Sequence, residues 1–445
     1  MLFSRKDLVR LILPLMVEQL LAITIGLADT VMVSTCGEAA ISGISQVDSI
    51  NVLLINIFSA LATGGAIISA QYLGRNEDDN ASVAAKQLIY TTGFCAVVVA
   101  ILCIIGNRFI LSLLFGQVEP EVMSNSEIYF FWSALSYPFL ALYNCGAALF
   151  RSMGNSKISM FASLIMNIIN ISGNALLIYG AGLGVAGAAI ASLASRIFGA
   201  IVMLRLLHHQ ENRIYIHDMR HPHLNPQMIR NILGLGIPNG MENGMFQIGK
   251  ILVQGLIASF GTVSIAANAV ANSVSTIPQI SGGAIGLAMI TVVGQCVGAG
   301  DYKQAKQYIL KLVGLTYISM GLLHVFILIT APFIVSVFGN LQAETADLAV
   351  LLIRSCSLFA IPFWPASFTL PNGLRAASDV KFTMTVSIFS MWVFRICFSF
   401  LLARYMGLGV LGVWLAMYID WIFRLICFII RFVRGKWQHQ QVAAA

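Results

Sequence analysis

Charged side chains are scarce in this sequence. Asp, Glu, Lys and Arg make up 10% of its 445 residues, and 58% of the residues are hydrophobic, whereas soluble domains carry about 25% charged residues. This shortage excludes a soluble globular protein. The apolar runs are continuous and do not alternate with polar residues, which excludes the strands of a transmembrane barrel. We therefore predict an all-α membrane protein, because only helices satisfy their own backbone hydrogen bonds in lipid.

Motifs of enzymes and cofactor proteins are also missing. The eight cysteines are scattered and include no CxxC pair, so we expect no metal or haem site. There is no Walker loop, zinc motif or nucleophile motif. The glycine-rich segment 180–187 lacks a preceding strand, and the histidines between 208 and 223 are interpreted as part of a solvated loop. We expect neither an enzyme nor a cofactor, beyond a coupling ion.

The apolar stretches are long enough for twelve transmembrane helices. The first stretch is interpreted as a helix because it is too long for the core of a signal peptide. The expected spans are 8–33, 43–72, 87–114, 127–150, 158–180, 184–208, 229–259, 264–297, 307–338, 346–374, 381–404 and 408–433.

The basic residues are unevenly distributed among the expected loops. Most of the 26 lysines and arginines fall on the N-terminus, the C-terminus and the loops that follow even-numbered helices. The positive-inside rule then places both termini in the cytoplasm, with a bacterial inner or plasma membrane as the expected location. This placement accounts for the net charge of +7, so a nucleic-acid partner is not expected.

The second half of the sequence repeats the first at a constant offset. After a one-residue slip, GLGVAG at 182–187 also matches GLGVLG at 407–412. We predict an N-terminal six-helix lobe at 1–212, a linker at 213–228 and a C-terminal six-helix lobe at 229–445, with both lobes in the same orientation. Pairs that share the offset include Pro14 with Pro238, Glu18 with Glu242, Gly37 with Gly261, Pro138 with Pro362 and Arg151 with Arg375.

Several segments resemble one transporter family. They are LADTVMV (27–33), GGAIISAQYLG (64–74), LFRSMGNSK (149–157), NISGNALLIYGAGLGVAGAAIAS (170–192), IPNGME (237–242), TVVGQCVGAGD (291–301) and GLRAASDVK (373–381). This set resembles the multidrug and toxic compound extrusion (MATE) transporters. The resemblance implies a V-shaped pair of lobes that exports organic cations in exchange for H⁺ or Na⁺. We expect a monomer embedded in the lipid bilayer.

Two alternatives to multidrug export stay open. The wider superfamily includes flippases of lipid-linked saccharides, whose anionic substrates would call for a cavity lined by arginines. A receptor or scaffold would leave the internal repeat and the buried charges without a role. The arginine candidates for a flippase cavity are Arg196, Arg354, Arg395 and Arg424.

Asp29 lies near the end of the first apolar helix, where a carboxylate is costly. Its equivalent in the second half is Val253, so the shared fold does not require an acid there. Polar residues of the fifth and sixth helices are expected at a similar depth. A carboxylate among such groups can take a proton or bind a hard cation. The resemblance implies an ion-coupling site made of Asp29, Asn170, Asn174, Ala188 (through its backbone) and Ser192.

Glu242 is expected near mid-membrane and resembles a glutamate of the sodium-type family members. Its equivalent in the first half, Glu18, leaves a structural role open for both. Lys250, two turns further on the same face, is expected to be the counter-charge of Glu242. Sodium-type members carry an aspartate where this chain has Trp364, which favours proton coupling or a cation in the N-terminal lobe.

Arg395 and Asp420 are expected at one depth on the last two helices. Arg424 lies one turn from Asp420. We interpret the group as a buried ion pair that joins the two helices, with a secondary role at the site as the alternative. The 18 methionines and 27 phenylalanines provide adaptable apolar walls for organic cations.

Overall fold

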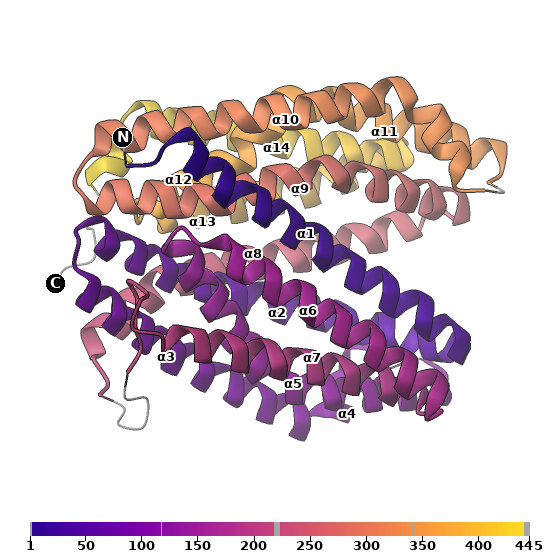
Figure 1. Ribbon diagram of the computed structural model, residues 1–445. Coiled ribbons are helices and arrows are strands. Elements are labelled where there is room, and N and C mark those ends of the chain that lie inside the picture. The colour runs from indigo at the N-terminus through magenta and orange to yellow at the C-terminus, as the bar shows by residue number, and fades with distance from the viewer. Residues whose placement is uncertain (1, 117, 218–222, 340, 440–445) are drawn as a thin grey trace. The chain divides into compact units, whose positions relative to one another are not determined.

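The computed structural model describes residues 2–116, 118–217, 223–339 and 341–439 (Figure 1). Over these ranges the chain is almost entirely helical and has no strand. Ten helical spans of the described chain are long and apolar enough to cross a membrane, by length and composition. Two further helices, α5 and α8, have 33 residues each. The prediction of an all-α membrane protein with twelve long helical segments is confirmed.

The helices of the first half follow the expected spans, with breaks that hydropathy does not reveal. The third span divides at Gly106 into α3 and α4, and a π-helical turn over Ala175–Gly180 ends the fifth span. The bounds are α1 Arg5–Val33, α2 Glu38–Gly74, α3 Asp78–Ile105, α4 Asn107–Phe115, α5 Pro120–Ser152, α6 Ser156–Asn174 and α7 Gly184–Leu207.

The described part of the second half contains three π-helical turns. They cover Pro365–Thr369, Met391–Cys397 and Phe400–Tyr405. The bounds of the α-helices are α8 Pro226–Ala258, α9 Thr262–Gly298, α10 Tyr302–Val337, α11 Ala343–Trp364, α12 Leu370–Ala376, α13 Val380–Ser390 and α14 Gly409–Val433.

The internal repeat is visible in the element bounds. Helices α2 and α9 begin and end at equivalent positions of the two halves. Each follows a glycine with a positive φ, +103° at Gly37 and +95° at Gly261, a conformation that side chains with a Cβ rarely adopt. The π-helical turns at Ala175–Gly180 and Phe400–Tyr405 also correspond, but only after the one-residue slip. The extra residue of the second half therefore lies between Arg375 and Phe400.

An additional π-helical turn accompanies that extra residue. Met391–Cys397 is π-helical, whereas the equivalent part of α6 is α-helical. Because a π turn closes i→i+5 hydrogen bonds, it accommodates one more residue than an α turn without interrupting the helix. The one-residue slip in the sequence repeat thus corresponds to a local widening of the helix at Met391–Cys397.

The contacts divide the chain into two compact units, Phe3–Gly240 and Met241–Ala444, the second also including Met1–Leu2. The division falls inside α8, whereas we expected a linker at 213–228, of which 218–222 lie outside the described residues. Gly64 explains the difference, because a Cβ there would lie 2.6 Å from the backbone nitrogen of Gly236. The first part of α8 therefore packs closely on α2.

Each unit has its own buried centre. In the first, α5 packs against α2, α3 and α7. In the second, α9 is the most buried helix and contacts α10, α11 and α12; α9 and α10 lie side by side in Figure 1. The positions of polar side chains within each unit are therefore fixed by the helix packing of that same unit.

Candidate functional site

The residues expected to form an ion-coupling site come together in the first unit. Asp29 lies in the last part of α1, where its Oδ1 accepts a 2.5 Å hydrogen bond from Asn174 Nδ2 of α6. Asn170, one turn earlier on α6, donates to Ser192 Oγ of α7 at 3.0 Å. The two asparagines are 3.4 Å apart, Nδ2 to Oδ1. Ala188 is buried one turn before Ser192 on α7. Three helices thus meet through a short chain of polar side chains.

A second carboxylate, Asp48 of α2, lies close enough to act electrostatically on Asp29. Its Oδ1 accepts hydrogen bonds from Asn51 Nδ2 at 3.2 Å and from Tyr129 OH at 3.4 Å. Sequence reasoning missed this residue. The test applied to Asp29 would have found it, because the equivalent of Asp48 in the second half is Asn272, which carries no charge.

Arg196 of α7 supplies the positive charge of this region and acts on both carboxylates. Its Nη1 donates to Ser136 Oγ at 2.5 Å. Two carboxylates and one guanidinium leave a formal charge of −1 when both acids are ionised. The cluster therefore attracts a proton, a small cation or an organic cation.

The side chain of Asn174 can contact Asp29 either as a bare carboxylate or as a carboxylate that binds a cation. Its amide donates to the carboxylate, while its own Oδ1 has no hydrogen-bond partner in the described chain. The N–H groups stabilise a bare carboxylate. A half-turn of the amide would instead present its oxygen beside the carboxylate, which is the ligand set that hard cations prefer.

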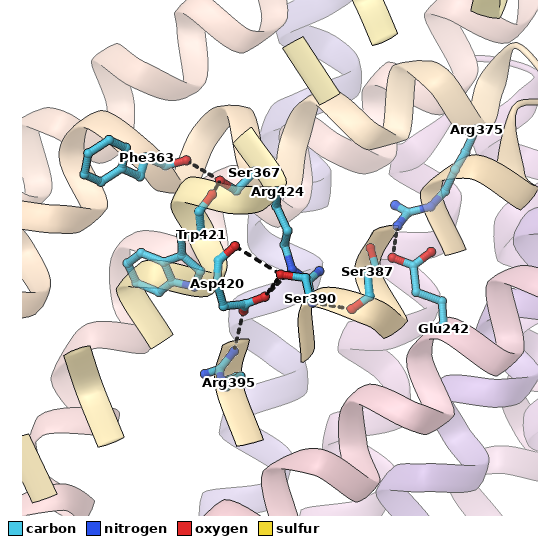
Figure 2. Close-up of polar contacts among 10 residues, drawn as sticks. All are labelled: Glu242, Phe363, Ser367, Arg375, Ser387, Ser390, Arg395, Asp420, Trp421 and Arg424. Carbon is cyan, nitrogen blue, oxygen red and sulfur yellow. Dashed lines mark hydrogen bonds and ion pairs between the residues drawn. The ribbon is translucent and has the colours of Figure 1, made fainter. Parts of the chain in front are cut away.

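Glu18 and Glu242 occupy the same structural position in the two halves. Arg151 Nη1 lies 3.2 Å from Glu18 Oε1, and Arg375 Nη2 lies 2.5 Å from Glu242 Oε1, as Figure 2 shows for the second pair. Both partners are related by the offset of the repeat, so one ion pair occurs twice. The expected pairing of Lys250 with Glu242 is therefore wrong. The ammonium group of Lys250 lies 5.1 Å from the ring centre of Phe246 instead.

This repetition predicts matched effects for Glu18→Gln and Glu242→Gln. Each change removes a carboxylate that pairs with a largely buried arginine, so we expect both variants to lose several degrees of thermal stability in detergent. Each should keep transport per folded molecule. Melting curves and efflux assays of the two variants provide the comparison. Loss of transport in Glu242→Gln alone, at normal stability, would assign coupling to Glu242 and contradict the scaffold role.

Asp420 is at the centre of a second polar cluster, drawn in Figure 2. It is fully buried, and its Oδ1 accepts hydrogen bonds from Arg424 Nε at 2.9 Å and from the hydroxyl of Ser390. Arg395 Nη1 lies 3.6 Å from its Oδ2. Ser367 ties the same helix to the turn after α11, because its hydroxyl donates to the carbonyl of Trp421 at 2.6 Å. The structure thus brings Arg395, Asp420 and Arg424 together, as expected.

Known proteins resemble this chain over most of its length. The MatE family model matches twice, over residues 14–176 and 238–401. A probable multidrug resistance protein NorM of Thermotoga maritima is 24% identical over 98% of this chain and 94% of its own length. The probable multidrug resistance protein YoeA of Bacillus subtilis is 26% identical over 85% of this chain and 82% of its own.

Solved structures share the fold. A crystal structure described as MATE in the bent conformation has a TM-score of 0.88 and 19% identity, over 97% of this chain and 94% of that one. A second is described as a superfamily transporter from Pyrococcus furiosus whose binding pocket of reverse polarity suggests a different function, with a TM-score of 0.87, 19% identity and coverage of 97% and 95%. With both halves matched by the family model at the spacing of its own internal repeat, this chain belongs to the MATE family of multi-pass membrane transporters.

Proposed function

We propose that this protein is a secondary active multidrug antiporter, which exports hydrophobic organic cations in exchange for H⁺ or Na⁺ by alternating access. The observation that carries the proposal is the hydrogen bond from Asn174 to Asp29, continued by the bond from Asn170 to Ser192. It makes a titratable group part of the connection between α1 and the α6–α7 pair. The names of the relatives, multidrug resistance proteins, support the choice of substrates.

Asp29 would couple the two fluxes through its charge. An ionised Asp29 holds the Asn174 amide by a charge-assisted hydrogen bond and contributes to the attraction of an organic cation. A proton removes that charge and a sodium ion compensates it, so either one weakens the attraction for the organic cation and releases it. Both effects act on the same carboxylate, so binding of the coupling ion and binding of the organic cation exclude each other there.

Coupling is proposed for the first unit alone. In the second unit Trp364 stands where sodium-type members have an acid, and it stacks on Phe368 with ring centres 5.0 Å apart. The carboxylate of Glu242 forms an ion pair with Arg375. We further propose a monomer in the inner or plasma membrane, with both termini in the cytoplasm, as the distribution of basic residues favours.

A flippase for a lipid-linked saccharide is the second candidate, because Arg395 lines a cavity of the second unit. The other arginines weigh against it. Arg196 bonds Ser136, and Arg424 bonds Asp420. Arg354 is exposed, and its Nε donates to the carbonyl of Leu328. A pyrophosphate group would therefore meet few arginines with donors to spare.

Efflux from proteoliposomes tests the proposal. We expect ethidium to leave vesicles against its gradient when a proton or a sodium gradient is imposed, and not when both are absent. The gradient that suffices identifies the coupling ion. Absence of ethidium movement under either gradient, with flipping of an undecaprenyl-linked saccharide in the same vesicles, would favour the flippase instead.

A further inference from the structure

The second unit contains a cavity that the proposed cation transport does not use. Two adjoining spaces of about 200 and 280 Å³ share several lining residues and lie between α8, α9, the turn Met391–Cys397 and α14. The residues common to both spaces are Lys250, Asn272, Thr276, Arg395, Trp414 and Met417.

Lys250 is an uncompensated charge in the wall of this cavity. It lies in the middle of α8 and is accessible from the cavity. Among residues 2–116, 118–217, 223–339 and 341–439, no carboxylate forms an ion pair with it. Its contact is the ring of Phe246. Arg395 acts on it electrostatically, so two like charges face the same space.

Arg395 has hydrogen-bond donors to spare. Its distance to Asp420, 3.6 Å, is too long for a hydrogen bond. The other oxygen of that carboxylate is already bonded by Arg424 and Ser390. No hydrogen bond from the guanidinium of Arg395 is found within the described part of the chain, and the group lies 5.2 Å from the ring centre of Phe246. Three cations and one carboxylate, Asp420, leave a formal charge of +2.

Neither cation belongs to the scaffold that the two halves share. The position equivalent to Lys250 in the first half is Gly26, and Arg395 lies in the π-helical turn that has no counterpart there. Conversely, the acids of the first unit, Asp29 and Asp48, correspond to Val253 and Asn272, which both line this cavity. The two units thus carry opposite charge at equivalent depths of one fold.

Part of the remaining wall is aromatic. Trp364 and Phe368 stack on each other, and Phe368 meets Trp421 at 89° with ring centres 6.3 Å apart. The indole Nε1 of Trp421 is buried without a hydrogen-bond partner in the described chain. Flat rings and one spare N–H donor suit a planar ligand that also carries an acceptor.

We propose that this cavity is a second ligand site, specific for an aromatic organic anion such as a carboxylate. The acid group lies between Lys250 and Arg395, where it relieves their mutual repulsion and accepts the hydrogen bonds of the guanidinium. The ring packs on the tryptophans and phenylalanines. Because the cations of the proposed antiport are attracted to the acids of the first unit, the two sites select ligands of opposite charge.

Calorimetric titration of the purified full chain in a neutral detergent tests the site. We expect 2-naphthoate to bind, and 2-naphthamide and 2-naphthylmethylammonium to bind at least about tenfold more weakly. Lys250→Gln and Arg395→Gln should each weaken naphthoate binding by about tenfold or more. Lys311→Gln, on an exposed face of α10, serves as the matched control and should bind as wild type.

Three results would overturn the assignment. One is equal binding of the three naphthyl compounds. Another is wild-type affinity in Lys250→Gln, which removes no ion pair and should fold even where Arg395→Gln does not. The third is displacement of naphthoate by phosphatidylglycerol but not by phosphatidylcholine, which would assign the site to a lipid headgroup. The titration needs neither membrane nor gradient, so its outcome is independent of whether cation antiport occurs.

Discussion

Asp29→Asn is expected to reduce gradient-driven ethidium efflux to the level of empty vesicles. The asparagine keeps the size of the side chain and one acceptor for Asn174, but it can neither release a proton nor supply a negative charge to a cation. The contact between α1 and α6 is kept, but the side chain at position 29 can no longer change its charge. Initial efflux rates in proteoliposomes, at equal amounts of folded protein, measure the effect. Asp29→Glu, which restores the charge, should recover part of the rate.

Asp7→Asn provides the matched control, because Asp7 is an acid of the same helix that caps its exposed start through Ser4. This variant should transport as wild type. Normal efflux by Asp29→Asn would show that Asp29 only anchors α1. Asp48, the neighbouring carboxylate that sequence reasoning missed, would then be the next candidate for coupling, ahead of the arginine-bound Glu242.

Asp420→Ala is expected to destabilise the protein more than either Glu18→Gln or Glu242→Gln. It removes the one carboxylate shared by Arg395 and Arg424 and leaves the buried Arg424 without a counter-charge. Breaking such a pair costs about 3–5 kcal/mol. Thermal unfolding in detergent, followed by tryptophan fluorescence, should show a large fall in the midpoint, and much of the variant should fail to fold during expression.

The exposed acid Asp347 of α11 is the control, since Asp347→Ala should leave the midpoint unchanged. A second variant distinguishes two causes of the lower stability, the loss of packing at position 420 and the unpaired charge of Arg424. Asp420→Leu combined with Arg424→Leu removes both members of the closest pair and should recover part of the stability. A midpoint for Asp420→Ala equal to that of wild type would mean that the arginines are solvated and that the cluster does not join α13 to α14.

The helices and the duplication could be predicted because both leave strong signals in the sequence. Membrane spans depend on length and polarity alone, and a fixed offset of identical residues needs no structure to be seen. The first and last residues of the helices were harder to predict. Helix α3 begins at Asp78, whereas hydropathy suggested 87, because the helix extends beyond its apolar part and carries Asp78 and Asp79 in its first turn, where acids are favourable.

Ion partners were harder to predict than positions. Helical spacing placed Lys250 on the face of Glu242, yet it contains no information on which neighbouring helix approaches that face. Arg375 directly follows the expected span 346–374, so it was expected in the adjoining loop. Its long side chain instead reaches the buried Glu242 from the end of α12. Only the packing of α12 against α8 decides that contact.

The Asp29 cluster was predictable for a different reason. Comparing the two halves singled out Asp29, because its equivalent is Val253. The family resemblance implied the other members, Asn170, Asn174, Ala188 and Ser192. The same comparison was not applied to Asp48, or to the pair of Lys250 and Arg395. All of these residues differ between the halves, so the repeat itself was the most informative reference in the sequence.

The π-helical turns show where the two lobes differ in construction. The turn at Ala175–Gly180 has a counterpart at Phe400–Tyr405, whereas the turn at Met391–Cys397 has none in the described part of the first half. Arg395 lies inside that unmatched turn. Two identical lobes would carry identical charges, so lobes of opposite polarity need positions at which their backbones or side chains differ, and the unmatched turn provides one such position.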